Sequence, residues 1–149
     1  MQLQLLLPSV IVTLLSFSLH AQFGAAPSQQ GSTSLASNKT ITIIALGDSL
    51  TEGYGLSKEE SYPSQLQNLL RQTYPQLKII NAGISGSTSA GAESRLKWQL
   101  KNKPDILLLA LGANDGLRGL SVSAMKKNLQ GAIELAQKNK VHVILAGMK

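Results

Sequence analysis

From residue 40 onward, the chain alternates between two patterns of apolar positions, one typical of buried strands and one typical of amphipathic helices. Four runs are almost wholly apolar and predict strands at residues 40–46, 77–81, 105–111 and 141–147. Three intervening segments repeat apolar residues every three or four positions and predict helices at residues 61–75, 88–103 and 121–140. The helix positions predicted to be buried are Tyr62, Leu66, Leu69, Leu70, Tyr74, Ala92, Leu96, Leu100, Met125, Leu129, Ala132, Ile133 and Ala136.

This order of elements predicts an α/β fold with a parallel sheet, because strands separated by helices are joined by right-handed crossovers. The strands are apolar on both faces, which predicts helices on both sides of the sheet. The carboxyl ends of parallel strands share one edge, where ligands bind. Three polar, glycine-rich loops follow the first three strands and are therefore expected to form a shared site: GDSLTEG at residues 47–53, NAGISGSTS at 81–89 and LGANDGLRG at 111–119.

Composition narrows the class of protein further. The chain has 149 residues, of which 43% are apolar and 15% charged, as expected for a globular domain with few charges. Its net charge is +6. The sequence lacks the clustered arginines and interleaved aromatic residues of a nucleic-acid-binding surface, so we interpret the excess positive charge as a solvated face. The absence of cysteine excludes a disulfide scaffold and a thiolate metal site.

The first 39 residues differ from the rest. Residues 3–19 are nearly continuously apolar and uncharged, and the small residue Ala21 follows, which predicts a secretory signal peptide over residues 1–21. An uncleaved N-terminal membrane anchor is the alternative. Residues 22–39 are rich in Ser, Gln, Gly and Ala and predict a flexible linker, so the folded domain is expected at residues 40–149. The protein is therefore predicted to be exported, either periplasmic or secreted.

Three residues in the loops are candidates for chemistry. Ser49 follows a strand directly, where its hydroxyl can project from the sheet edge, and Gly47 and Gly53 relieve crowding around it. Gly86 allows a backbone N–H to approach a ligand oxygen closely. Asn114 carries a side-chain amide that can donate to a developing oxyanion, which is the requirement for ester hydrolysis by a serine.

Each candidate also has a purely structural interpretation. Ser49 can cap a turn, Gly86 can occupy a turn with positive φ, and Asn114 can bond its own loop. Asp48 and Asp115 are expected to tie loops together through backbone N–H groups. The loop at residues 83–91 precedes a helix, as phosphate-binding loops do, but lacks the Gly-Lys-Ser/Thr ending of a P-loop.

The segments ALGDSLTEGYG, NAGISGSTS and LGANDGLRG together resemble the first three sequence blocks of the SGNH, or GDSL, hydrolases. The match is nearest to the bacterial exported thioesterase, arylesterase and lysophospholipase group. The resemblance implies a flavodoxin-like three-layer α/β/α sandwich with five parallel strands. It implies that Ser49 is the nucleophile and that the oxyanion hole consists of the N–H groups of Ser49 and Gly86 and the amide of Asn114. It implies acyl transfer from small esters or thioesters, with no metal or organic cofactor.

The family also places an Asp and a His in a D-x-x-H pattern near the C-terminus, and this pattern does not occur in the chain. The two histidines are His20, in the predicted signal, and His142, inside the last predicted strand. We therefore expect an N-terminal part of a hydrolase whose C-terminal part, with the fifth strand, is missing, and which is inactive alone. Two alternatives stay open: a non-catalytic acyl-binding or interaction fragment, and a carbohydrate acetylesterase. Lipid substrates are possible, nucleic acid is not expected, and the sequence leaves the oligomeric state open.

Overall fold

A computed structural model describes residues 39–147 of the chain. Its centre is a sheet of four parallel strands, and their order in the sheet is β2-β1-β3-β4. The strands are β1 (Ile41–Gly47), β2 (Leu77–Gly83), β3 (Ile106–Ala110) and β4 (His142–Leu145). The predicted α/β fold with a parallel sheet is confirmed. All four predicted strands are present, and β2 extends two residues beyond its predicted end.

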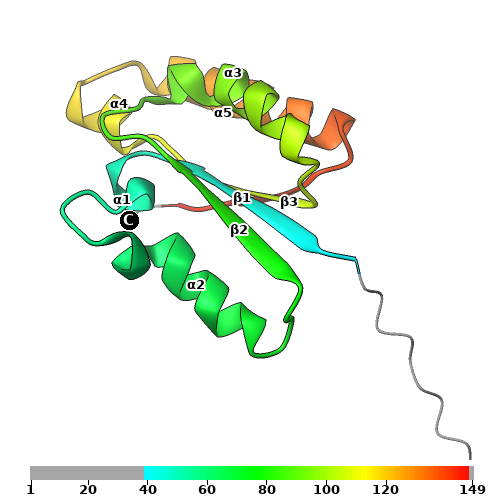
Figure 1. Cartoon of the computed structure of the whole chain (residues 1–149). Coiled ribbons are helices and arrows are strands. Elements are labelled where there is room, and N and C mark those ends of the chain that lie inside the picture. The colour runs from blue at the N-terminus through cyan, green and yellow to red at the C-terminus, as the bar shows by residue number, and fades with distance from the viewer. Residues whose placement is uncertain (1–38, 148–149) are drawn as a thin grey trace, which may run out of the picture. The chain divides into compact units, whose positions relative to one another are not determined.

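Helices lie on both faces of the sheet, as predicted. Helices α3 (Ala92–Gln99) and α5 (Val122–Lys138) pack against each other on one face, and α2 (Tyr62–Arg71) lies on the other (Figure 1). Short 3₁₀ turns, η2 (Ser89–Gly91) and η3 (Leu100–Asn102), extend α3 at its two ends, and η1 (Lys58–Glu60) precedes α2. Two further short helices, α1 (Ser49–Glu52) and α4 (Ala113–Leu117), lie where the sequence predicted only loops.

The core fills the space between the sheet and the pair α3 and α5. The strand side chains on this face are fully buried, and so are the helix side chains that meet them; the members of this cluster with no exposed surface are Ile44, Leu46, Leu107, Leu109, Ala92, Leu96, Ala132 and Ala136. Of the stripes predicted to be buried on these two helices, Ala92, Leu96, Ala132 and Ala136 are fully buried, and the remaining positions are half-buried: Leu100, Met125, Leu129 and Ile133. Each fully buried Leu or Ile contributes about 1.5–3 kcal/mol.

The opposite face is covered less completely. Of the positions predicted to be buried in residues 61–75, Leu66 and Leu70 are half-buried. The other three are exposed: Tyr62 at 36%, Leu69 at 62%, and Tyr74, beyond the end of the helix, at 52%. The prediction that the whole apolar stripe of residues 61–75 is buried was wrong at these positions, because α2 packs mainly against β2 at one side of the sheet. Strand β4 has exposed side chains as well, and Ile144 is 53% exposed.

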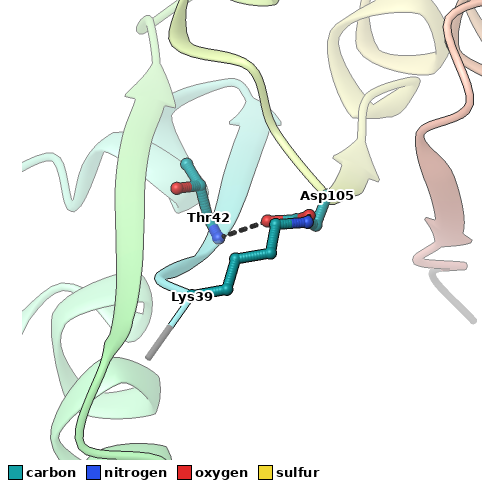
Figure 2. A network of polar contacts seen from close by, with 3 residues as sticks. All are labelled: Lys39, Thr42 and Asp105. Carbon is teal, nitrogen blue, oxygen red and sulfur yellow. Dashed lines mark hydrogen bonds and ion pairs between the residues drawn. The ribbon is translucent and has the colours of Figure 1, made fainter. Parts of the chain in front are cut away.

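A small polar network joins the beginnings of two strands (Figure 2). Asp105, just before β3, accepts a hydrogen bond of 2.9 Å from the backbone N–H of Thr42 in β1. Its carboxylate also forms an ion pair with the ammonium group of Lys39, at 2.5 Å. The hydrogen bond from Lys39, followed by that from Thr42, lowers the pKa of the Asp105 carboxyl. The network joins β1 to the start of β3 at the edge opposite the glycine-rich loops.

The predicted signal peptide at residues 1–21 and nearly all of the predicted linker at 22–39 lie outside the described residues. Within residues 39–147, no helix is both long enough and apolar enough to cross a membrane.

Candidate active site

The register of the sheet brings the three glycine-rich loops to one level. Gly47 at the end of β1 pairs with Gly83 at the end of β2 and with Ala110 at the end of β3. The loops that follow these strands therefore leave the sheet side by side. The prediction that they share one edge is confirmed, and α1 and α4 lie at this end of the sheet (Figure 1).

Ser49 is the first residue of helix α1 rather than a residue of an irregular loop. The preceding residue, Asp48, is the N-cap, and its carboxylate accepts a 3.0 Å hydrogen bond from the N–H of Leu50. Gly47 allows the chain to pass directly from β1 into α1, because a Cβ at this position would lie 1.8 Å from the hydroxyl oxygen of Thr51. Ser49 itself is half-buried. Within residues 39–147 its N–H and its hydroxyl have no hydrogen-bond partner, so both are available to a ligand.

Gly86 lies in a turn over residues 84–87, which is closed by a 3.2 Å hydrogen bond from the N–H of Ser87 to the carbonyl of Ile84. Its φ of +74° at the third position is characteristic of a type II turn and favours glycine. The positive-φ interpretation of Gly86 is thus confirmed. In the part of the chain that the structure describes, the Gly86 N–H donates to no protein acceptor, so it too can meet a ligand oxygen.

Asn114 lies in the first turn of α4 and reaches toward both other loops. Its Nδ2 donates to the carbonyl of Ser87 at 3.0 Å and approaches Oδ2 of Asp48 at 3.4 Å. Asn114 thus contacts the residue after Gly86 and the residue before Ser49. An amide nitrogen has two hydrogens. Ser87 accepts one of them at 3.0 Å and Asp48 accepts the other at 3.4 Å, so an oxyanion would replace the longer of the two contacts.

Two aspartates of the loops are buried, and Asp115 ties two loops together through a backbone N–H as predicted, whereas the backbone bond of Asp48 stays within its own loop. Asp115, which is 3% exposed, accepts hydrogen bonds from both the N–H (2.8 Å) and the hydroxyl (2.6 Å) of Ser89 in the second loop. Asn128 of α5 donates to the same hydroxyl. Asp48 is 2% exposed and serves the first loop through Leu50. These contacts fix the second and third loops relative to each other.

Arg95, a residue that no sequence motif singled out, contacts the ends of two strands at the site. Its Nη2 donates to the carbonyl of Gly47 at 2.8 Å and to that of Ala82, so one guanidinium joins the ends of β1 and β2. Burial lowers the pKa of Arg95, while the negative charge of Asp48 acts in the opposite direction. The sequence offered one clue to the role of Arg95. It precedes Leu96, which belongs to the apolar stripe of the helix that faces the sheet.

A mostly apolar cavity of about 250 Å³ adjoins α1 on the face of the sheet that carries α2. Tyr62 contributes its ring, and its hydroxyl lies 3.1 Å from that of Thr51. Burial raises the pKa of Tyr62, and the contact with Thr51 opposes this rise. The lining residues are Asp48, Leu50, Thr51, Tyr62, Leu108, Ala110 and Ala146.

His142 is remote from Ser49. It is the first residue of β4, and its register partner is Ile106, which in turn pairs with Ile43. Four residues of strand, or about 13 Å, separate that level of the sheet from Gly47. His142 therefore lies well before the edge of the sheet that carries Ser49. Among residues 39–147, no cluster of three or more His, Cys, Asp or Glu side chains is arranged to hold a metal ion.

The site therefore presents one serine hydroxyl and three potential donors at a single edge of a parallel sheet. A model of the GDSL-like lipase/acylhydrolase family matches residues 45–148, which include all three loops. The chain belongs to this family.

Proteins similar to this chain include an arylesterase from Vibrio mimicus, which is 37% identical over 113 residues. The match covers 75% of this chain and 56% of that protein. Esterase TesA from Pseudomonas aeruginosa is 34% identical over 109 residues, which are 72% of this chain and 54% of TesA. Among solved structures, the SGNH-hydrolase family esterase AlinE4 is 44% identical with a TM-score of 0.70, over 74% of this chain and 60% of AlinE4.

The chain spans about half the length of the curated relatives it matches. The family and the fold are shared over this part. The relatives have further sequence outside the match.

Proposed function

We propose that this chain contributes the nucleophile and the oxyanion hole of an exported serine hydrolase that cleaves acyl esters or thioesters. Ser49 is the nucleophile, and the donors are the N–H groups of Ser49 and Gly86 and Nδ2 of Asn114. The observation that carries the proposal is the reach of Asn114, whose amide contacts the neighbours of both Ser49 and Gly86. Residues 1–21 act as the signal peptide, residues 22–39 as a linker and residues 40–149 as the hydrolase domain.

The reaction is acyl transfer in two steps. The Ser49 oxygen attacks the carbonyl carbon, and the three donors stabilise the negative charge on the carbonyl oxygen; each is worth about 2.7–4 kcal/mol of barrier. Collapse of the tetrahedral intermediate releases the alcohol or thiol and leaves an acyl group on Ser49. Water then hydrolyses this ester and regenerates the serine. The substrates are small acyl esters or thioesters, including lipid acyl esters.

A serine hydroxyl needs a base to take its proton. His142 begins β4 at the opposite end of the sheet, so it does not serve. We propose that an Asp and a His in a D-x-x-H pattern, supplied by a longer form of the protein, complete the triad. The 149-residue chain is then inactive or nearly so.

A direct test compares three proteins on nitrophenyl esters of different acyl lengths and on an acyl thioester: the 149-residue chain, the chain extended by the downstream coding sequence, and the extended chain with Ser49→Ala. We expect turnover from the extended protein alone. A downstream sequence with no D-x-x-H in any frame would count heavily against the proposal, as would turnover that survives Ser49→Ala.

The alternative is a binding fragment without catalysis. The remote position of His142 favours it for the 149 residues by themselves. Turnover by this chain that Ser49→Ala abolishes would exclude that alternative. Acetylated sugars in the same panel would identify a carbohydrate acetylesterase.

A further inference from the structure

Two charged residues outside the proposed oxyanion hole hold the turn that contains Gly86. Glu52 lies at the end of α1, three residues after Ser49, and its Oε2 accepts hydrogen bonds from both the N–H (2.7 Å) and the hydroxyl of Ser85. Arg118 follows α4, and its Nη2 donates to the carbonyl of Gly86 at 2.8 Å. The turn is thus bonded on one side to the helix of Ser49 and on the other to the helix of Asn114.

The backbone of Glu52 is held firmly enough to act as an anchor. It lies directly on the end of β2, where a Cβ on Gly83 would come within 2.1 Å of the Glu52 nitrogen. Asn81 of β2 donates to the carbonyls of Thr51 at 2.8 Å and Glu52 at 3.3 Å. The carboxylate therefore extends from a fixed position to Ser85.

Arg118 is anchored on the other side. Its backbone N–H donates to the carbonyl of Asn114 at 3.2 Å, so its position follows that of the proposed oxyanion donor. The side chain then crosses to the carbonyl of Gly86. The contacts of Glu52 with Ser85 and of Arg118 with Gly86 each involve an ionised side chain, which makes them stronger than neutral hydrogen bonds.

The turn needs such support because it is exposed. Ile84, Ser85 and Gly86 are all exposed, and the turn is closed by a single 3.2 Å hydrogen bond. A glycine adds backbone freedom. An oxyanion donor is effective only when it is already in position as charge develops.

We propose that Glu52 and Arg118 are positioning residues that set the distance of the Gly86 N–H from the donors on α1 and α4. This inference rests on the proposed function for its catalytic consequence. Its structural part concerns the turn alone and is tested separately.

The first measurement is the backbone order parameter of Ser85 and Gly86 in the 149-residue chain, by ¹⁵N relaxation. We expect values near the rigid limit of about 0.85 in the wild type and below about 0.6 in the double variant Glu52→Ala/Arg118→Ala. Glu52→Gln and Arg118→Lys keep one hydrogen-bonding group each and restore the order. The matched controls are Glu59→Ala and Lys126→Ala, which remove exposed charges elsewhere. An ordered turn in the double variant, with an unchanged spectrum, overturns the inference.

The second measurement uses the extended protein of the preceding test. There Glu52→Ala and Arg118→Ala each lower kcat by about 10- to 100-fold with KM nearly unchanged, because a displaced donor acts on the transition state. Glu52→Gln recovers most of the loss, which separates positioning from the effect of the charge. A disordered turn with unchanged kcat overturns the catalytic part. If Ser49-dependent turnover is absent altogether, the proposed function fails, while the order parameters still decide the structural part.

Discussion

The two faces of the sheet differ in how far they are buried, although the strands are apolar on both. Strand β3 shows this within one segment. Leu107 and Leu109 point toward α3 and α5 and have no exposed surface, whereas Ile106, Leu108 and Ala110 point to the other face and are only half-buried. On that face the main packing of α2 is against β2 (Figure 1). The pattern of apolar residues along a strand therefore shows which side chains can be buried, and the packing of the neighbouring helices determines which of them are buried.

The largest expected effect lies on the covered face. Leu107→Ala removes a fully buried side chain and leaves a cavity between the sheet and the helices. We expect the free energy of unfolding to fall by about 2–5 kcal/mol, measured by urea denaturation of the 149-residue chain. A loss below about 1 kcal/mol would mean that this face is not the core.

The second effect concerns the polar contact beside the covered face. Asp115→Ala leaves the buried N–H and hydroxyl of Ser89 without their acceptor. We expect a loss of about 1–3 kcal/mol in the free energy of unfolding. Asp115→Asn keeps one acceptor oxygen and should lose less. Equal losses in the two variants would show that the charge, rather than the hydrogen bonds, stabilises the loops.

The third prediction uses the neighbour of Leu107 on the other face. Leu108→Ala should cost about 1 kcal/mol or less, because Leu108 is only half-buried and borders a cavity that already exists. Leu107→Ala is its matched control, with the same chemistry in the same strand. A cost as large as that of Leu107→Ala would break the comparison and show that the second face is covered in solution.

The smallest effect lies at the strand starts, outside both faces. The pKa of Asp105 is lowered by Lys39 and Thr42, so its contribution is present above the unfolded-state pKa of about 3.9 and is lost as the pH falls through the lower folded-state value. With a partly exposed ion pair this contribution is about 1 kcal/mol or less. Urea denaturation at pH 7 and pH 3 should show a smaller acid loss in Asp105→Asn than in the wild type. An unchanged loss would show that the network in Figure 2 contributes nothing.

The predicted elements and the predicted edge agree with the structure, because both depend on local periodicity and on the geometry of parallel strands. The short helices α1 and α4 were not predicted. Each has four or five residues and lacks an apolar stripe, so periodicity gives no signal. Asp48 before Ser49 was the available clue, since a side-chain cap at that position begins a helix. The contacts of Arg95, Glu52 and Arg118 join segments at least 13 residues apart, and no local pattern reveals them.

The sequence by itself determined the class of fold and the family, and it singled out Ser49, Gly86 and Asn114 as the residues on which the proposed function rests. Strand and helix periods and the glycine-rich loops are local features, and parallel strands have a common carboxyl edge. Only the tertiary structure decided which face is buried, how far His142 lies from Ser49, and which side chains hold the turn of Gly86. These depend on strand register and helix packing, which bring distant parts of the chain into contact.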